Sequence, residues 1–114
     1  MDETNKPNQV IVTVDANKTI VCTPDPLPAL GHDIELKFVL KTEGYVFPND
    51  DTAVVVTNPG PEFPRPSKTL PPGNTTATLF DRNSKAGSFK YTVNVWPSGG
   101  GQALSLDPMI NNGP

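Results

Sequence analysis

One segment, residues 87–97, constrains the fold of this chain more than any other. It reads GSFKYTVNVWP, with Phe89, Tyr91, Val93 and Val95 at every second position. Side chains alternate between the two faces of a β-strand, so this period of two predicts a half-buried strand with an aromatic and β-branched inner face. The segment ends at a proline, which has no N–H to donate to a continuing ladder. We therefore expect a β protein packed around this strand.

Proline and glycine divide the rest of the sequence into short segments. The 114 residues include 14 prolines and 9 glycines, and these lie between apolar runs. This distribution favours many short strands, and no segment keeps the 3.6-residue period of a helix. A chain of this length fits one domain with its own core. We predict an all-β fold, a single two-sheet antiparallel sandwich of seven or eight strands at residues 9–111, with a flexible arm at 1–8 and a tail at 112–114.

Apolar alternation locates the other strands at residues 9–14, 18–23, 33–40, 53–57, 75–80 and 102–106. Segment 53–57 is apolar on both faces, which predicts a central strand covered on both sides. Proline-rich segment 24–31 predicts an extended crossing between the sheets. Segment 58–73 holds six prolines among its sixteen residues and predicts a long irregular loop, of the kind that is often functional or mobile. The predicted core consists of Val12, Ile20, Ile34, Leu36, Phe38, Val54, Val56, Leu79, Phe89, Tyr91, Val93 and Leu106.

The layout of these segments resembles a known sandwich family. A strand is followed by residues 44–48 (GYVFP), and the late strand begins with residues 87–93 (GSFKYTV). Over residues 9–111 this resembles the cupredoxin-like β-sandwich of small bacterial proteins, and an immunoglobulin-like topology stays open. A blue-copper site needs two imidazoles and a thiolate, whereas this chain has one histidine, His32, and one cysteine, Cys22. The resemblance therefore implies the scaffold without its copper ligands.

The residues that could carry chemistry do not form a catalytic set. His32 precedes Asp33 at the junction of a loop and the strand expected at 33–40, and if both residues lie in the strand their side chains point to opposite faces and cannot pair as in a hydrolase triad. We expect His32 at the surface and Cys22 as a buried thiol. Oxygen-rich segments 49–51 and 81–83 could bind calcium, but Asp and Asn are also the usual turn formers. We predict turns there, no metal, no cofactor and no enzymatic activity.

Binding is the function class that the sequence favours. Exposed aromatic side chains can anchor a protein partner or stack on a sugar, and Tyr45, Phe63 and Trp96 are the candidate contact residues. The competing interpretation, which we favour, is that Trp96 covers a sheet edge and Phe63 anchors its loop. We predict a module for protein–protein interaction or structural assembly, whose partner is an unknown protein or a second copy. A domain that binds carbohydrate or a small ligand and a divergent metal-binding protein are the alternatives.

Charge and hydropathy argue against two classes of partner. The formal net charge is -3, and lysine and arginine do not cluster, so the sequence lacks a nucleic-acid footprint. No apolar run reaches the length that crosses a bilayer, and the polar start lacks the apolar core of a signal peptide. We expect a cytoplasmic protein that binds neither nucleic acid nor membrane, with a trimmed export signal as the alternative.

Overall fold

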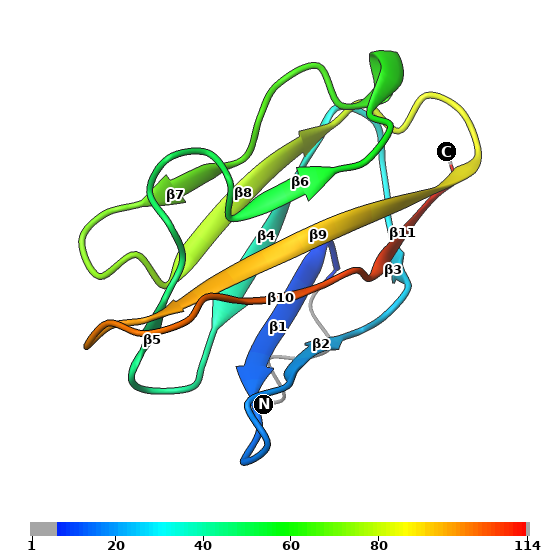
Figure 1. Cartoon of the computed structure of the whole chain (residues 1–114). Helices are drawn as coiled ribbons and strands as arrows, with labels where there is room; N and C mark the ends of the chain where they lie inside the picture. Colours follow the sequence, from blue (N-terminus) through cyan, green and yellow to red (C-terminus); the bar gives the residue numbers. More distant parts are fainter. Residues whose placement is uncertain (1–6, 114) are drawn as a thin grey trace.

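The computed structural model describes residues 7–113, and these form a sandwich of two β-sheets around one hydrophobic core (Figure 1). The strand order of the first sheet is β2-β1-β4-β8-β7. Its strands are β1 (Gln9–Val14), β2 (Ile20–Thr23), β4 (Ile34–Leu40), β7 (Lys68–Leu70) and β8 (Thr76–Asp81).

The second sheet is built on one long strand, β9 (Gly87–Pro97). Val93 of β9 pairs with both Val54 and Leu106, so the strands that contain these two residues lie on opposite sides of β9. One side holds β10 (Leu104–Leu106) and β11 (Met109–Asn112), with β3 (Leu27–Pro28) beyond β11. The other side holds β5 (Tyr45–Val46) and β6 (Val54–Val56).

The prediction for residues 87–97 is confirmed. β9 has these bounds, and Tyr91, Val93 and Val95 are completely buried while the side chains between them are partly or well exposed. Tyr91 meets Phe38 of the first sheet edge to face, with ring centroids 5.5 Å apart. Edge-to-face contact suits the quadrupoles of two aromatic rings and joins the two sheets through the centre of the core.

The predicted core is largely confirmed. Nine of its residues are buried, namely Val12, Ile20, Leu36, Phe38, Val54, Val56, Leu79, Tyr91 and Val93. Ile34, Phe89 and Leu106 are only partly buried and pack against the margin of the core. Removing a large side chain from the fully buried set, such as that of Phe38, costs roughly 3–5 kcal/mol.

The sheets are mixed, so the prediction of a purely antiparallel sandwich with seven or eight strands is wrong in detail. β1 pairs parallel to β4, and β11 pairs parallel to β3. The described residues form eleven strands, several of them only two or three residues long. Strands of two or three residues are too short to show an alternation of apolar and polar side chains in the sequence. A strand that contains proline, such as β3, also donates few hydrogen bonds to its neighbours.

The crossing predicted at residues 24–31 is confirmed and explains the parallel pairing. β2 belongs to the first sheet, β3 to the second and β4 to the first again. The chain therefore leaves the first sheet after β2 and returns beside β1 in the same direction as β1. A parallel neighbour requires a crossover of this kind.

Two predictions about the middle of the chain are wrong. Segment 53–57 contains β6, which lies at the edge of its sheet and leaves Val55 42% exposed. Segment 58–73 is not one irregular loop, because it contains a 3-10 turn, η2 (Gly60–Glu62), and strand β7. Both differences arise from long-range pairing, which decides which strand is central and which segment joins a sheet.

The ends of the domain differ from the predicted boundaries. Residues 1–6 of the expected arm lie outside the described residues, and Asn8 accepts a hydrogen bond from Leu30 N (2.8 Å) and donates one to Leu30 O (3.0 Å). β11 runs through Asn112, which is buried, and Gly113 N donates to Asn83 Oδ1 (2.8 Å). Part of the expected tail therefore belongs to the sandwich.

Candidate functional site: an open edge strand beside a proline-rich wall

β6 is an edge strand whose outer side is accessible to pairing. Within residues 7–113 it pairs with β9 alone. The N–H of Thr57 donates to Lys90 O (2.9 Å), so Thr57 is a hydrogen-bonded position of this antiparallel ladder. Hydrogen-bonded positions recur at every second residue. Val55 therefore also faces β9, and the backbone N–H and C=O groups of Val54 and Val56 face away from it.

Three of these four outward backbone groups have no partner among the described residues. The N–H of Val54 donates to Ser67 Oγ (3.2 Å), and Ser67 donates in turn to Asp51 O (3.4 Å). The C=O of Val54 and both groups of Val56 receive no further hydrogen bond from residues 7–113. An edge of this kind is a template for another strand.

A hollow of about 210 Å³ opens along this outer side of β6, and we call it the β6 groove. Val54–Val56 line one side, and the buried side chains of Phe63 and Leu79 line its apolar part. The opposite side belongs to residues 59–66, the proline wall, which contributes three prolines to the lining. Figure 1 shows β6 next to β9 on one side and near the segment that leads through η2 to β7 on the other. The groove therefore joins an open backbone edge to an apolar surface.

Two charged residues, Asp51 and Arg65, also line the β6 groove. Both side chains belong to exposed residues. The guanidinium carbon of Arg65 lies 4.6 Å from the centroid of the Phe80 ring. A cation above an aromatic face is attracted by the ring quadrupole, and at an exposed site this contributes about 0.5–1 kcal/mol. The contact holds the Arg65 side chain against Phe80 of β8.

The proline wall is fastened to the sandwich by the buried carboxylate of Glu62. Its Oε1 accepts hydrogen bonds from Ser84 N (2.8 Å), Lys85 N (3.2 Å) and Asn112 Nδ2 (3.1 Å), and its Oε2 accepts one from the Ser84 hydroxyl. The hydrogen bond from the Ser84 side chain lowers the pKa of Glu62 most, and the other donors lower it further against the effect of burial. The ring of Phe63, the next residue, packs edge to face on the ring of Phe89, with the two ring centroids 5.0 Å apart. Polar and aromatic contacts together hold the wall opposite β6.

A second buried carboxyl, Asp81, completes this polar cluster. Asp81 Oδ1 accepts hydrogen bonds from Asn83 N (2.9 Å) and Asn112 Nδ2 (3.0 Å), whereas Asp81 Oδ2 and Asn112 Oδ1 have no partner among the described residues. Burial raises the pKa of Asp81, and the nearby charge of Glu62 raises it further, against the hydrogen bonds from Asn83 and Asn112 that lower it. One amide thus bridges two carboxyl groups whose pKa values are shifted in opposite directions.

The three aromatic candidates do not form a common binding surface. Phe63 is buried, with 4% exposure, so it is not an exposed aromatic, and its packing on Phe89 agrees with the interpretation that it anchors its loop. It still lines the β6 groove, and its role as a contact stays a prediction. Trp96 is 43% exposed. Tyr45 pairs with Pro97 while Trp96 pairs with Val46, so Tyr45 and Trp96 project from opposite faces of the sheet. Tyr45 lines a separate hollow of about 220 Å³ near the turn at residues 100–102.

Cys22 and His32 lie where the sequence predicts them. Cys22 is buried in β2, and burial raises the pKa of its thiol to about 12, with a smaller contribution from the charge of Asp25. A thiol with so high a pKa is unreactive near neutral pH. His32 is exposed at the start of the segment that leads into β4.

The oxygen-rich segments form turns, as predicted. Asp50 Oδ1 accepts a hydrogen bond from Thr52 N (3.3 Å) and another from the Thr52 hydroxyl. Asp81 Oδ1 accepts from Asn83 N in the same i to i+2 arrangement. These are the side-chain-to-backbone bonds by which Asp stabilises a turn. Among the described residues, no group of three or more His, Cys, Asp or Glu side chains is placed to hold a metal ion.

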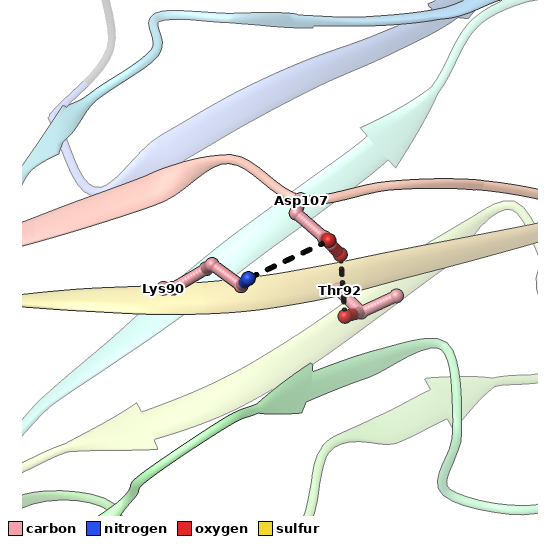
Figure 2. A network of polar contacts seen from close by, with 3 residues as sticks. All are labelled: Lys90, Thr92 and Asp107. Atoms are coloured by element: carbon pink, nitrogen blue, oxygen red, sulfur yellow. Dashed lines mark hydrogen bonds and ion pairs between the residues drawn. The ribbon is translucent and has the colours of Figure 1, made fainter.

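The outer face of β9 carries a polar network (Figure 2). Lys90 Nζ lies 3.8 Å from Asp107 Oδ2, and Thr92 donates from Oγ1 to Asp107 Oδ1 (2.7 Å). The Lys90 and Asp107 side chains are about half exposed, so the ion pair is screened by water and contributes little stability. Lys90 also lines an open hollow of about 340 Å³ with Ser88, Phe89 and Thr57. This face is a solvated, polar surface.

Sequence reasoning missed both the open edge and the polar cluster beneath the wall. The edge had a local signal that we interpreted differently, namely an apolar residue at each position of β6. The polar cluster had only a weak signal in the sequence, because Glu62, Asp81 and Asn112 are far apart in the chain and are brought together only by the fold. A glutamate within a proline-rich apolar segment was the available sign of a buried anchor.

No family model and no curated protein matches this sequence. In the part of the chain from residue 7 to residue 113, none of the helical structure is long and apolar enough to cross a membrane.

Proposed function

We propose that this chain is a non-enzymatic binding module that holds a protein partner in the β6 groove. The observation that supports this function is the combination of unpaired backbone groups on Val54 and Val56 with an adjoining apolar hollow. Unpaired backbone donors and acceptors are costly when they are withdrawn from water without a partner. A protein partner supplies both the matching backbone groups and apolar side chains.

The size and chemistry of the groove favour a protein segment over a small organic ligand. Pockets for drug-sized ligands occupy about 300–1,000 Å³, whereas this hollow is about 210 Å³. That space suits one or two side chains of a longer chain. The exposed side chain of Val55 adds apolar surface at the open rim of the hollow.

A panned peptide library tests this proposal. We would display random twelve-residue peptides on phage, select them against the intact protein and measure the affinity of each enriched peptide by fluorescence polarisation. Val55→Glu places a charge at the groove, and Val21→Glu places the same charge on β2. The two valines are equally exposed, at 42%, so the second variant is a matched control.

We expect enriched peptides to lose at least about tenfold in affinity for Val55→Glu and to keep their affinity for Val21→Glu. A charge beside an apolar groove adds a desolvation cost that the distant charge does not. Failure to enrich any peptide, or equal losses with both variants, would show that the groove is not the binding site.

A further inference from the structure

The geometry points to a specific binding mode, which rests on the function proposed above: the partner is an extended segment that adds to β6 as a further strand of the second sheet. Its backbone pairs with the open groups of Val54 and Val56, and every second side chain enters the β6 groove. The partner is therefore an apolar–polar alternating peptide segment from another protein.

The hydrogen-bonding pattern of β6 specifies an extended backbone. Val56 offers one N–H and one C=O on its outer side, and Val54 offers one C=O. These groups lie on alternate residues of a strand, so they match the N–H and C=O groups of alternate residues in a second strand. A helix satisfies its own backbone groups and leaves the edge unpaired. Strand addition is an established mode of peptide recognition that depends on such edges.

The side chains beside the edge specify which residues the partner carries. Val54 and Val56 are buried and point toward the core, while Val55 points to solvent. We take the added strand to be antiparallel to β6, so the partner residue directly opposite Val56 exchanges both hydrogen bonds with it and projects its side chain on the same face as Val56, toward Phe63 and Leu79. Its neighbours project beside Val55. The partner thus carries apolar residues at the positions whose N–H groups bond to β6, and tolerates polar residues between them.

The proline wall favours a single segment over a second copy of this domain. A two-fold pairing of β6 with β6 would bring the proline wall of each copy against the other copy. The open side of β6 faces a hollow bounded by residues 59 and 63–66, which leaves space for a narrow chain. β6 is also only three residues long, and two copies would share few hydrogen bonds. A free strand or a chain terminus meets neither obstacle.

N-methylation of the bound peptide separates strand addition from other ways of occupying the groove. The probe is the tightest peptide from the panned library, synthesised with one backbone N-methyl group at each position in turn. N-methylation removes one donor and leaves the side chain unchanged. We expect about tenfold losses at the two alternate residues whose N–H groups donate to the C=O groups of Val54 and Val56, and we expect these two residues to be apolar. On the protein, Val56→Pro removes the outward N–H without breaking a β6–β9 bond, and we expect it to weaken the unmethylated peptide by about tenfold.

The outcomes distinguish this inference from the function on which it rests. If no peptide binds the groove, the proposed function itself fails. A second outcome is that peptides bind the groove, as the Val55→Glu and Val21→Glu pair shows, and yet lose no affinity on N-methylation or lose it without a period of two. In that case the groove binds proteins by side-chain contacts, and strand addition is wrong. Sedimentation velocity over a hundredfold range of concentration gives a further check. A dimer that Val56→Pro dissociates would overturn the single-segment partner in favour of a second copy.

Discussion

β1 and β6 are both rich in valine, yet they occupy opposite environments. β1 lies between β2 and β4, and all of its residues except Thr13 are buried, including Ile11 on the face away from the main core. β6 has β9 as its sole strand neighbour among residues 7–113, and its central residue, Val55, is 42% exposed. Apolar composition alone does not distinguish a central strand from an edge strand.

The difference between the two strands bears directly on function. An apolar side chain in β1 is used for folding, because two neighbouring strands and the core cover it. An apolar side chain on the outer face of β6 is not needed for the fold, and it lies beside open backbone groups and a hollow. Edge strands commonly carry charges or prolines that prevent pairing. β6 carries three valines, and the prolines stand across the groove from it.

The largest expected effect comes from placing a charge in each strand. Val12→Asp buries a carboxylate without a partner at the centre of β1. The free-energy cost of burying that charge is comparable to or greater than the roughly 5–15 kcal/mol by which a typical domain is stable. We expect Val12→Asp to be unfolded by circular dichroism. Val55→Asp should change the free energy of unfolding by less than about 1 kcal/mol. A folded Val12→Asp variant with normal stability would contradict the central position of β1.

A smaller effect is expected where the proline wall is fastened. β1 is held by apolar packing, whereas the wall opposite β6 is held through Glu62 and the amide of Asn112. Asn112→Ala removes both hydrogen bonds that this amide donates, so we expect a loss of about 1–3 kcal/mol in urea unfolding. Asn111→Ala is the control, since it removes only one exposed hydrogen bond, which Asn111 Oδ1 accepts from the Ser88 hydroxyl (2.9 Å), and it should cost about 0.5 kcal/mol. Equal stability of the two variants would show that the cluster does not fasten the wall.

Local patterns predicted the parts of the fold that depend on one segment. The alternation of residues 87–97 gave both the bounds of β9 and its buried face, because a strand's two faces follow from its own side chains. The turns at Asp50 and Asp81 were also predicted, since an Asp side chain bonds to the backbone two residues later.

Features that depend on distant pairing could not be predicted in this way. β6 appeared central because each of its positions is apolar, and only the sheet order shows that one side lacks a neighbour. The sequence predicted that Phe63 anchors its loop but not where, because its neighbour Phe89 and the partners of Glu62 come from distant segments. The site itself is therefore a product of the fold, and the sequence alone indicated only the segments that contribute to it.

Proline substitutions sharpen the assignment of which β6 residues face outward. The N–H of Val55 belongs to the β6–β9 ladder, and the N–H of Val56 does not. Val55→Pro removes a ladder hydrogen bond and leaves an acceptor on β9 unpaired, so we expect a cost of about 1–3 kcal/mol. Val56→Pro should cost less, about 1 kcal/mol, because only side-chain packing changes. Urea unfolding of the two variants measures the difference, and a greater loss for Val56→Pro would reverse the register on which the groove is based.

The smallest effect concerns pH, which acts on the cluster behind the wall and leaves β1, a strand without ionisable side chains, unaffected. The pKa of Asp81 is raised in the folded protein, so its ionised form destabilises the fold above that pKa, and this penalty disappears as the pH falls toward 3.8, the ordinary value. Asp81→Asn should therefore be more stable than the wild type at pH 7, with the difference shrinking at pH 4.

The lowered pKa of Glu62 acts in the opposite direction. The stability that its ionised form contributes is complete above pH 4.5 and is lost as the pH falls further. Glu62→Gln should thus be less stable than the wild type at pH 7, and this deficit should shrink only below pH 4.5. Urea unfolding of the three proteins between pH 3 and 7 separates the two carboxyl groups, and differences that stay constant with pH would show that neither titrates differently in the folded state.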